Sequence, residues 1–146
     1  MIELEKLRKY SSDVVEAIRA VHKELGPGLN EAIYHEGLNI ELTERNIPFE
    51  KEFCFHPSYH GIKLDASFTM DFLVKSDIIV EIESAKEKLN DEHRKILFNH
   101  MRFFQPQVGI LVNFYPDFAE IEQYFFSKEK QRLYGSDRLQ IKNFYM

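Results

Sequence analysis

The chain contains a single cysteine, Cys54, among its 146 residues. An internal disulfide is therefore impossible, and neither a multi-cysteine zinc site nor a redox-active cysteine pair can form. Long apolar runs are also missing, because no stretch approaches the roughly 20 residues that a membrane-spanning helix requires. These absences predict a soluble protein of the reducing cytoplasm that has no membrane partner.

Positive charge is not in excess either, since 19 basic residues face 24 acidic ones and the formal net charge is -5. Nucleic-acid binding would therefore need a local basic patch rather than a global attraction. The C-terminal tail offers either such a patch or an ordinary solvated segment, with Lys128, Lys130, Arg132, Arg138 and Lys142. The hydrophobic fraction of 44% is enough for one core, which predicts a single domain over residues 1–146.

Apolar residues at helical spacing predict a first helix over residues 13–25, with Asp13 as its N-cap. The Gly26-Pro27-Gly28 sequence ends this helix, because proline cannot continue the hydrogen-bond ladder and glycine adopts conformations closed to other residues. A second helix is predicted over residues 30–46, directly before Pro48.

The rest of the chain alternates between the two-residue period of strands and the longer period of helices. Residues 56–61 have the composition of a turn. Strands are predicted over 49–55, 67–75, 78–84, 108–112 and 139–144, and helices over 90–104 and 117–126. This order predicts a single α/β domain with a mixed β-sheet flanked by α-helices.

Two neighbouring strands carry acidic side chains. Asp71 alternates with an apolar face, and Glu81 and Glu83 share one face of the next strand. With a three-residue turn over residues 75–77, Asp71 lies directly across from Glu81, and three acids gather on one side of the hairpin. A two-residue turn would instead place Asp71 on the face of Ile82. The predicted apolar face of the first strand comprises Phe68, Met70, Phe72 and Val74.

Clustered carboxylates raise one another's pKa and destabilise the fold unless a cation neutralises them, and Mg²⁺ or Mn²⁺ does so through oxygen ligands. An acidic strand edge balanced by Lys75 and Lys86 is the alternative. Glu31 shares a predicted helix face with Tyr34, Leu38 and Leu42, so its side chain is expected to point inward. It would then either join the acidic site or cap the start of its helix.

Several motifs follow one another in an order that resembles the GxxExxY proteins, a branch of the PD-(D/E)xK nuclease superfamily. The naming motif is Gly28-Leu29-Asn30-Glu31-Ala32-Ile33-Tyr34, preceded by Val21-His22-Lys23-Glu24-Leu25-Gly26-Pro27. The strand of Asp71 follows, then Ile79-Val80-Glu81, and finally Gly109-Ile110-Leu111-Val112-Asn113-Phe114. The resemblance covers about residues 12–114 and leaves 115–146 as a divergent C-terminal extension.

The resemblance implies a restriction-endonuclease-like fold in which Asp71 and Glu81 bind magnesium and Glu31 is an additional acid. In such nucleases the metal polarises the scissile phosphate and activates a water, while a lysine two residues after the second acid assists. Glu83 occupies that position here, and Ile96 stands where the family tends to carry a glutamine. Glu83 is therefore expected to be a third metal ligand or a general base, which completes the catalytic set with Glu31, Asp71 and Glu81.

Two functions follow from this pattern. One is magnesium- or manganese-dependent hydrolysis of phosphodiester bonds in nucleic acid, with DNA favoured over RNA; the other is a catalytically inactive nuclease-fold domain used for binding or assembly. Lys86 or Lys95 could restore the missing positive charge. His93 and His100 lie two turns apart on one predicted helix, where they either touch the site or pack in the core. Phe125-Phe126 belongs either to the core or to the contact of a homodimer.

Overall fold

The alternating strand and helix patterns produce one mixed sheet with helices on both faces. The computed structural model describes residues 2–135, so the strand predicted over 139–144 lies outside the described residues. The helices in this part of the chain are α1 (Ile2–Leu25), α2 (Glu31–Glu44) and α3 (Asp91–Phe104). The strands are β1 (Phe49–Phe55), β2 (Ser58–Tyr59), β3 (Ile62–Lys63), β4 (Phe68–Val74), β5 (Ile78–Glu83), β6 (Val108–Asn113), β7 (Glu120–Ser127) and β8 (Arg132–Gly135).

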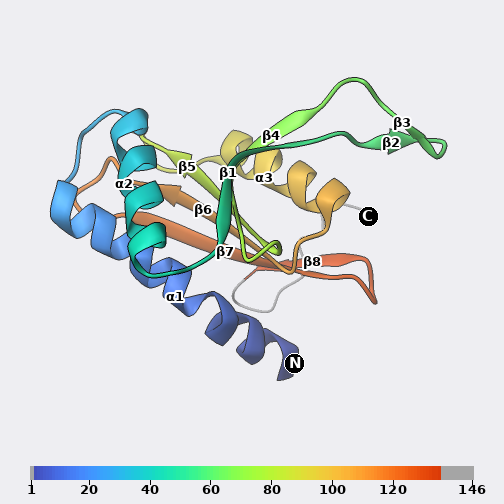
Figure 1. Cartoon of the computed structure of the whole chain (residues 1–146), viewed down its shortest axis with the longest axis horizontal. Coiled ribbons are helices and arrows are strands. Elements are labelled where there is room, and N and C mark those ends of the chain that lie inside the picture. Colours follow the sequence, from blue (N-terminus) through green and yellow to red (C-terminus); the bar gives the residue numbers. More distant parts are fainter. Residues whose placement is uncertain (1, 136–146) are drawn as a thin grey trace.

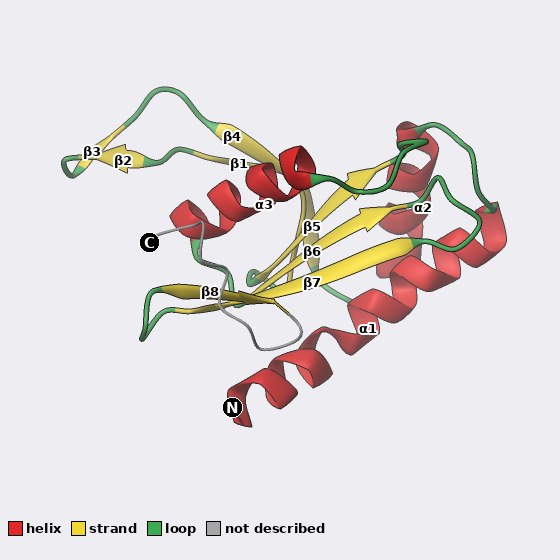
Figure 2. Cartoon of the chain, turned by 180° about the vertical axis from the view of Figure 1, so that it is seen from behind, coloured by secondary structure: helices red, strands yellow, loops and turns green. Residues whose placement is uncertain are grey.

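Six strands form the main sheet in the order β1-β4-β5-β6-β7-β8. The β5–β6 pair is parallel, because α3 connects these strands, and the other pairs are antiparallel. Helices α1 and α2 lie on one face of the sheet and α3 on the other (Figures 1 and 2). The predicted α/β domain with a mixed sheet between helices is confirmed.

Each face of the sheet has its own hydrophobic cluster. The first joins α1 and α2 to the sheet and includes Ile18, Leu38 and Val80, all fully buried. The second lies under α3 and includes Leu97, Met101 and Leu111. The central strands β5 and β6 contribute to both clusters, so their apolar residues run almost without interruption, as expected for strands covered on both faces. Within residues 2–135, the longest helices are too polar to cross a membrane.

Helix α1 begins eleven residues before the predicted position, at Ile2 instead of residue 13. Leu4 and Leu7 continue the apolar stripe of the helix, although charged residues separate them in the sequence. Asp13 therefore lies inside the helix rather than at its N-cap, and its Oδ1 accepts a hydrogen bond from Lys75 Nζ at 3.0 Å. This contact ties the middle of α1 to the turn between β4 and β5.

The helix predicted over residues 117–126 is wrong, because this segment forms strand β7. Ile121 and Phe125 pack toward α1 and α2, whereas Tyr124 and Phe126 pack toward α3. A strand covered on both faces shows no simple apolar alternation, which explains the error. Phe125 and Phe126 are 1% and 3% exposed, so both belong to the core.

The turn predicted over residues 56–61 is part of a longer feature. Strands β2 and β3 form a separate two-stranded sheet that extends away from the body of the protein, beyond β1 and β4 (Figure 1). Tyr59 and Ile62, on this hairpin, are 65% and 69% exposed.

Gly109 tests how closely α3 packs on the sheet. A Cβ atom at this position of β6 would lie 2.3 Å from Met101 Sδ, and the Met101 side chain is fully buried. We expect Gly109→Ala to lower the free energy of unfolding in urea by about 1–3 kcal/mol, because the larger residue forces Met101 out of place.

Met101→Ala provides the control, because it removes the side chain that the new methyl group meets. Alone, Met101→Ala should lower the free energy of unfolding by about 2–5 kcal/mol. The double variant with Gly109→Ala should lose clearly less than the sum of the two single losses. Strict additivity of the two changes would show that the close contact does not explain the effect.

Candidate active site

The Gly-Pro-Gly segment and Tyr34 fix the loop between α1 and α2. Tyr34 is fully buried, and its hydroxyl donates to the Gly26 carbonyl at 2.6 Å and accepts from the Leu29 N–H at 3.1 Å. Its ring stacks on Phe114, with the ring centroids 4.6 Å apart. Gly26 and Gly28 have φ values of 82° and 81°, which a side chain would disfavour. The tyrosine therefore holds the loop against the residue that follows β6.

The same loop is also bound to the ends of two strands. Ser84 Oγ, just after β5, donates to the Leu29 carbonyl at 2.5 Å, and Gly28 N–H donates to the Tyr115 carbonyl at 3.0 Å. Asn30 caps α2 by accepting from the Ile33 N–H at 3.3 Å. Glu31, the first residue of α2, is thereby placed near the C-terminal end of β5, where Glu83 lies.

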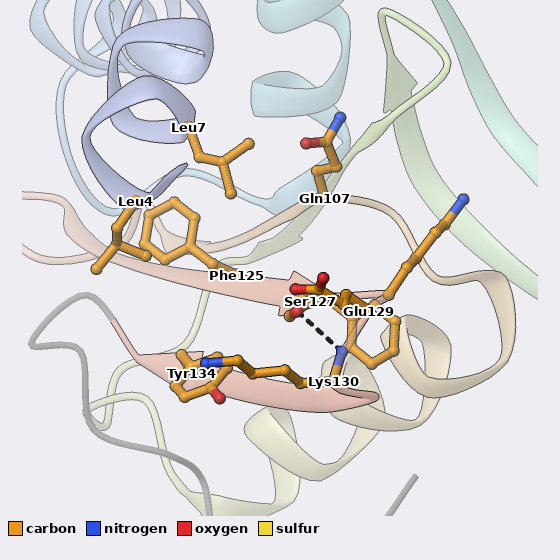
Figure 3. Close-up of a pocket in the computed structure, with 10 residues that line it drawn as sticks. Leu4, Leu7, Gln107, Phe125, Ser127, Glu129, Lys130 and Tyr134 are labelled. Atoms are coloured by element: carbon orange, nitrogen blue, oxygen red, sulfur yellow. Dashed lines mark hydrogen bonds between the residues drawn. The ribbon is translucent and has the colours of Figure 1, made fainter. Parts of the chain in front are cut away.

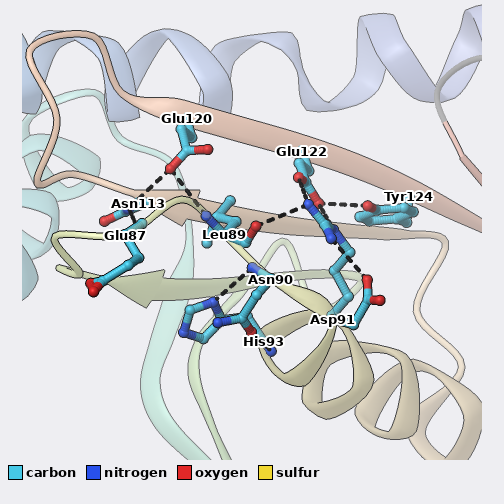
Figure 4. Close-up of polar contacts among 10 residues, drawn as sticks. Glu87, Leu89, Asn90, Asp91, His93, Asn113, Glu120, Glu122 and Tyr124 are labelled. Atoms are coloured by element: carbon cyan, nitrogen blue, oxygen red, sulfur yellow. Dashed lines mark hydrogen bonds and ion pairs between the residues drawn. The ribbon is translucent and has the colours of Figure 1, made fainter.

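A second anchor holds the segment that connects β5 to α3. Asn113, fully buried at the end of β6, accepts from the Ala85 N–H and donates to the carbonyls of Ala85 and Glu87 and to Glu120 Oε1 (Figure 4). Glu120 also accepts from the Leu89 N–H. One amide thus satisfies several backbone groups of a connection that has no regular structure of its own.

Arg94 fixes the first turn of α3 to the sheet. Its guanidinium donates to both carboxylate oxygens of Glu122 in β7, at 2.8 and 2.7 Å, and also contacts Asp91 (Figure 4). Burial alone would raise the pKa of Glu122, but hydrogen bonds from Arg94 and Tyr124 outweigh it and lower that pKa. The start of α3, which carries His93, is therefore held in place.

Of the two registers that the sequence leaves open for the β4–β5 hairpin, the structure has the one with the three-residue turn. Val74 pairs with Ile78 and Phe72 with Val80, which leaves the three-residue turn over 75–77. Continuing this register places Asp71 across from Glu81. Asp71 Oδ2 accepts the backbone N–H of Ile82 at 2.8 Å, so its carboxylate bonds the neighbouring strand directly, just beyond the last paired residues.

The predicted apolar face of β4 is wrong, because the strand changes faces at Asp71. Phe72 and Val74 pack toward α1 and α2, whereas Phe68 and Met70 pack toward α3. In the register of β1 with β4, Asp71 lies opposite Glu52, whose φ of 52° is unusual for a residue other than glycine. Simple alternation of faces along β4 fails here because the backbone of the β1–β4 strand pair is distorted at this position.

Each of the three strand acids has a histidine partner. Asp71 Oδ1 lies 3.4 Å from His35 Nε2 in α2. The other two partners come from α3: Glu83 Oε1 lies 3.6 Å from His93 Nε2, and Glu81 Oε2 lies 2.5 Å from His100 Nδ1. The histidine partners thus come from helices on opposite faces of the sheet. His35 was not identified from the sequence, although its position four residues after Glu31 is the signal that reveals it.

Glu31 does not point inward as predicted. Tyr34, Leu38 and Leu42 form the buried face of α2, but the Glu31 side chain is 49% exposed and its Oε2 lies 3.9 Å from His35 Nε2. As the first residue of the helix, Glu31 projects beyond the part of α2 that the sheet covers. It lies at the rim of the site, together with His35.

The four acids influence one another electrostatically. Burial raises the pKa of Glu83 to about 7, and the charges of Glu31, Asp71 and Glu81 add to the increase. The pKa of Glu31 is raised by partial burial and by Asp71. Burial also raises the pKa of Glu81, which His100 partly offsets, and the hydrogen bond to Asp71 is the main cause that raises the pKa of His35. The acids therefore form one electrostatic cluster.

Neither Lys86 nor Lys95 supplies the positive charge of the lysine that was expected at the position of Glu83. Lys86 and Lys95 are exposed, and within residues 2–135 neither forms an ion pair with the acids. Ile96 is likewise 49% exposed and adds no polar group. The histidines are the basic side chains that contact the cluster.

The donor chemistry of the cluster suits a hard cation, because carboxylate oxygens are the ligands that Mg²⁺ and Mn²⁺ prefer. In the part of the chain that the structure describes, however, no three His, Cys, Asp or Glu side chains are grouped closely enough to hold a metal ion. Asp71 and Glu81 are instead turned toward their histidines. The residues fit a divalent cation by ligand type, but among the described residues their side chains are not grouped around one point.

Two cavities differ in their relation to the acids. A polar cavity of about 430 Å³ adjoins the cluster on the α2 side, lined by Glu31, Ala32, His35, Glu36, Asn39, Lys51, Glu52 and Asp71. A second cavity of about 390 Å³ lies between the start of α1 and strands β7 and β8, where Leu4, Leu7, Phe125 and Tyr134 line it (Figure 3). None of the four acids lines the second cavity.

Comparison with known proteins identifies the family of this fold and site. A family model described as the PD-(D/E)XK nuclease superfamily matches residues 8–124. The chain belongs to this superfamily. The crystal structure of SSO0001 is similar, with a TM-score of 0.50 and 23% sequence identity, over 79% of this chain and 59% of that chain. This likeness shows a shared overall fold. No curated protein matches the chain.

Members of the PD-(D/E)XK superfamily typically depend on magnesium. The pattern that names the superfamily consists of an acid and of a second acid that one residue separates from a lysine. The chain has the fold of the superfamily, and Asp71, Glu81 and Glu83 remain the residues that the sequence predicts for these three positions.

Glu83 gives a pH-dependent prediction for the metal-free protein. Its pKa of about 7 in the folded chain exceeds the ordinary value of 4.5, so between these pH values the folded state keeps a proton that the unfolded state has lost. Stability must then fall as pH rises through this window. Glu83→Gln removes the effect, and in EDTA it should be more stable than the wild type by about 1–2 kcal/mol at pH 8, after allowance for solvent screening.

Urea unfolding at pH 4.5 and pH 8 measures this difference. Near pH 4.5 the advantage of Glu83→Gln should nearly vanish, because the wild-type carboxyl is then protonated as well. Glu16→Gln, a change of the same charge on the exposed surface of α1, should show no such trend. An advantage of Glu83→Gln that is equal at both pH values would contradict the raised pKa.

Proposed function

We propose that this protein hydrolyses phosphodiester bonds in nucleic acid, preferably DNA, with Mg²⁺ or Mn²⁺ held by Asp71, Glu81 and Glu83. The observation that carries the proposal is the electrostatic cluster of acids, in which the pKa of Glu83 is raised to about 7. A divalent cation would relieve this repulsion, and oxygen ligands suit Mg²⁺. The anchored Gly28-to-Tyr34 loop supports placing the chain in the GxxExxY branch.

The bound cation would polarise the scissile phosphate and lower the pKa of an attacking water. Asp71 and Glu81 hold the cation in this scheme, and Glu83 either completes the ligand set or accepts the proton of the water. A carboxylate with a pKa near 7 is well matched to a general base at neutral pH. Glu31, at the rim of the polar cavity, adds negative charge that favours cation binding.

A specific observation favours a second function. Asp71 and Glu81 are already paired with His35 and His100, and Glu83 replaces the lysine of the family pattern. Such an arrangement is also compatible with a nuclease-fold domain that has lost catalysis and serves binding or assembly. The two functions differ in whether a divalent cation and Asp71 are needed.

Asp71→Asn separates them. The asparagine oxygen can still accept the Ile82 N–H, so the strand contact is kept while the charge is lost. For a nuclease, calorimetry should show that Mg²⁺ and Mn²⁺ bind the wild type and that Asp71→Asn weakens binding at least about tenfold. Cleavage of single- and double-stranded oligonucleotides should stop in this variant and in EDTA.

Asp65→Asn, an exposed acid next to the β2–β3 hairpin, is the matched control and should leave both readouts unchanged. Absence of metal binding in the wild type, or nucleic-acid binding that neither EDTA nor Asp71→Asn affects, would reject the nuclease in favour of the binding module.

A further inference from the structure

The contact between His100 and Glu81 differs from the other two histidine contacts. Glu81 and His100 are 7% and 8% exposed, and the His100 Nδ1 to Glu81 Oε2 distance of 2.5 Å is that of a short hydrogen bond. The contacts of His35 and His93 with their acids are longer, at 3.4 and 3.6 Å. His100 thus makes the shortest of the three imidazole contacts to an acid of the cluster among the described residues.

Two elements fix the position of the His100 ring. The ring lies on α3 next to the fully buried Met101, and it stacks on Phe68 of β4 with the centroids 4.3 Å apart and the planes at 9°. A ring held in this way presents Nδ1 to Glu81 in one orientation only. A buried carboxylate also needs such a partner, because an unpaired charge is costly away from water.

The contact uses only one of the two carboxylate oxygens. Within residues 2–135, Glu81 Oε2 has the hydrogen bond from His100, whereas Oε1 takes part in no hydrogen bond. Both oxygens of Asp71 are engaged, by His35 and by the Ile82 N–H. The Glu81 carboxylate is therefore held on one side and available on the other.

We propose that His100 is a positioning residue, whose Nδ1–H holds Oε2 of Glu81 so that Oε1 is presented to the divalent cation. The inference rests on the proposed metal-dependent function and concerns a residue that acts through Glu81 without touching the substrate. Partners that orient a metal ligand in this way commonly contribute 10–100-fold to metal affinity or activity, as an order of magnitude.

Two substitutions separate positioning from packing. His100→Asn keeps an amide N–H donor close to the place of Nδ1 but loses the ring that stacks on Phe68. His100→Leu keeps apolar packing against Phe68 but has no donor. If His100 positions Glu81, His100→Leu should weaken Mn²⁺ binding about 10–100-fold, whereas His100→Asn should stay close to the wild type.

Manganese binding to the full chain is measured by the EPR signal of free Mn²⁺, with thermal unfolding to establish that each variant is folded. On an oligonucleotide substrate, His100→Leu should lower kcat and leave KM nearly unchanged, because the substrate does not contact His100. His56→Leu is the matched control, since His56 contacts the Leu64 carbonyl beside the β2–β3 hairpin instead of an acid.

Each outcome decides one question. Wild-type Mn²⁺ affinity in folded His100→Leu would overturn the positioning role and leave the proposed function intact. A loss in His100→Asn as large as that in His100→Leu would show that an N–H donor at this position does not support Mn²⁺ binding, which also overturns the positioning role. No Mn²⁺ binding by the wild-type protein would instead reject the proposed function, and the positioning role with it.

Discussion

Repulsion among Glu31, Asp71, Glu81 and Glu83 is the constraint that shapes this end of the sheet. Each acid is held by a different means: Asp71 by the backbone N–H of Ile82, Glu81 by His100, Glu83 by nearby His93, and Glu31 by its place in the first turn of α2. A helix start favours negative charge, because its N–H groups lack partners. Nevertheless the pKa of Glu83 stays near 7, so the compensation is incomplete.

The rest of the fold holds these groups together through two anchors. The Tyr34 hydroxyl fixes the loop before α2, and the Asn113 amide fixes the connection from β5 to α3. Both anchors act at the C-terminal ends of β5 and β6, which meet at one edge of the sheet because these strands are parallel. Gly26, Gly28 and Tyr34 thus contribute geometry, because they place Glu31 beside the strand acids.

The sequence allowed the sheet around the site to be predicted, but not its distortion. The sequence left a two-residue and a three-residue turn open for the β4–β5 hairpin, and the structure has the three-residue turn. Alternation treats a strand as regular, so the change of faces at Asp71 could not be foreseen. Strand β7 was mistaken for a helix because apolar residues point to both of its faces. His35 was missed, although helical spacing placed it one turn from Glu31.

Glu83, at the position where the resemblance predicts a lysine, is best understood together with the histidines. A change from Lys to Glu at such a position alters the local charge by two units, and no lysine in residues 2–135 forms an ion pair with the acids to offset it. Instead, imidazoles contact the acids: His35 lies beside Asp71 and Glu31, His93 beside Glu83, and His100 beside Glu81. Glu83 differs from Asp71 and Glu81 because its pKa stays raised to about 7, so its removal would reduce the repulsion more than it removes stabilising contacts. A domain used only as a scaffold would gain stability by losing this acid, and its presence is therefore an argument for the proposed chemical role of the cluster.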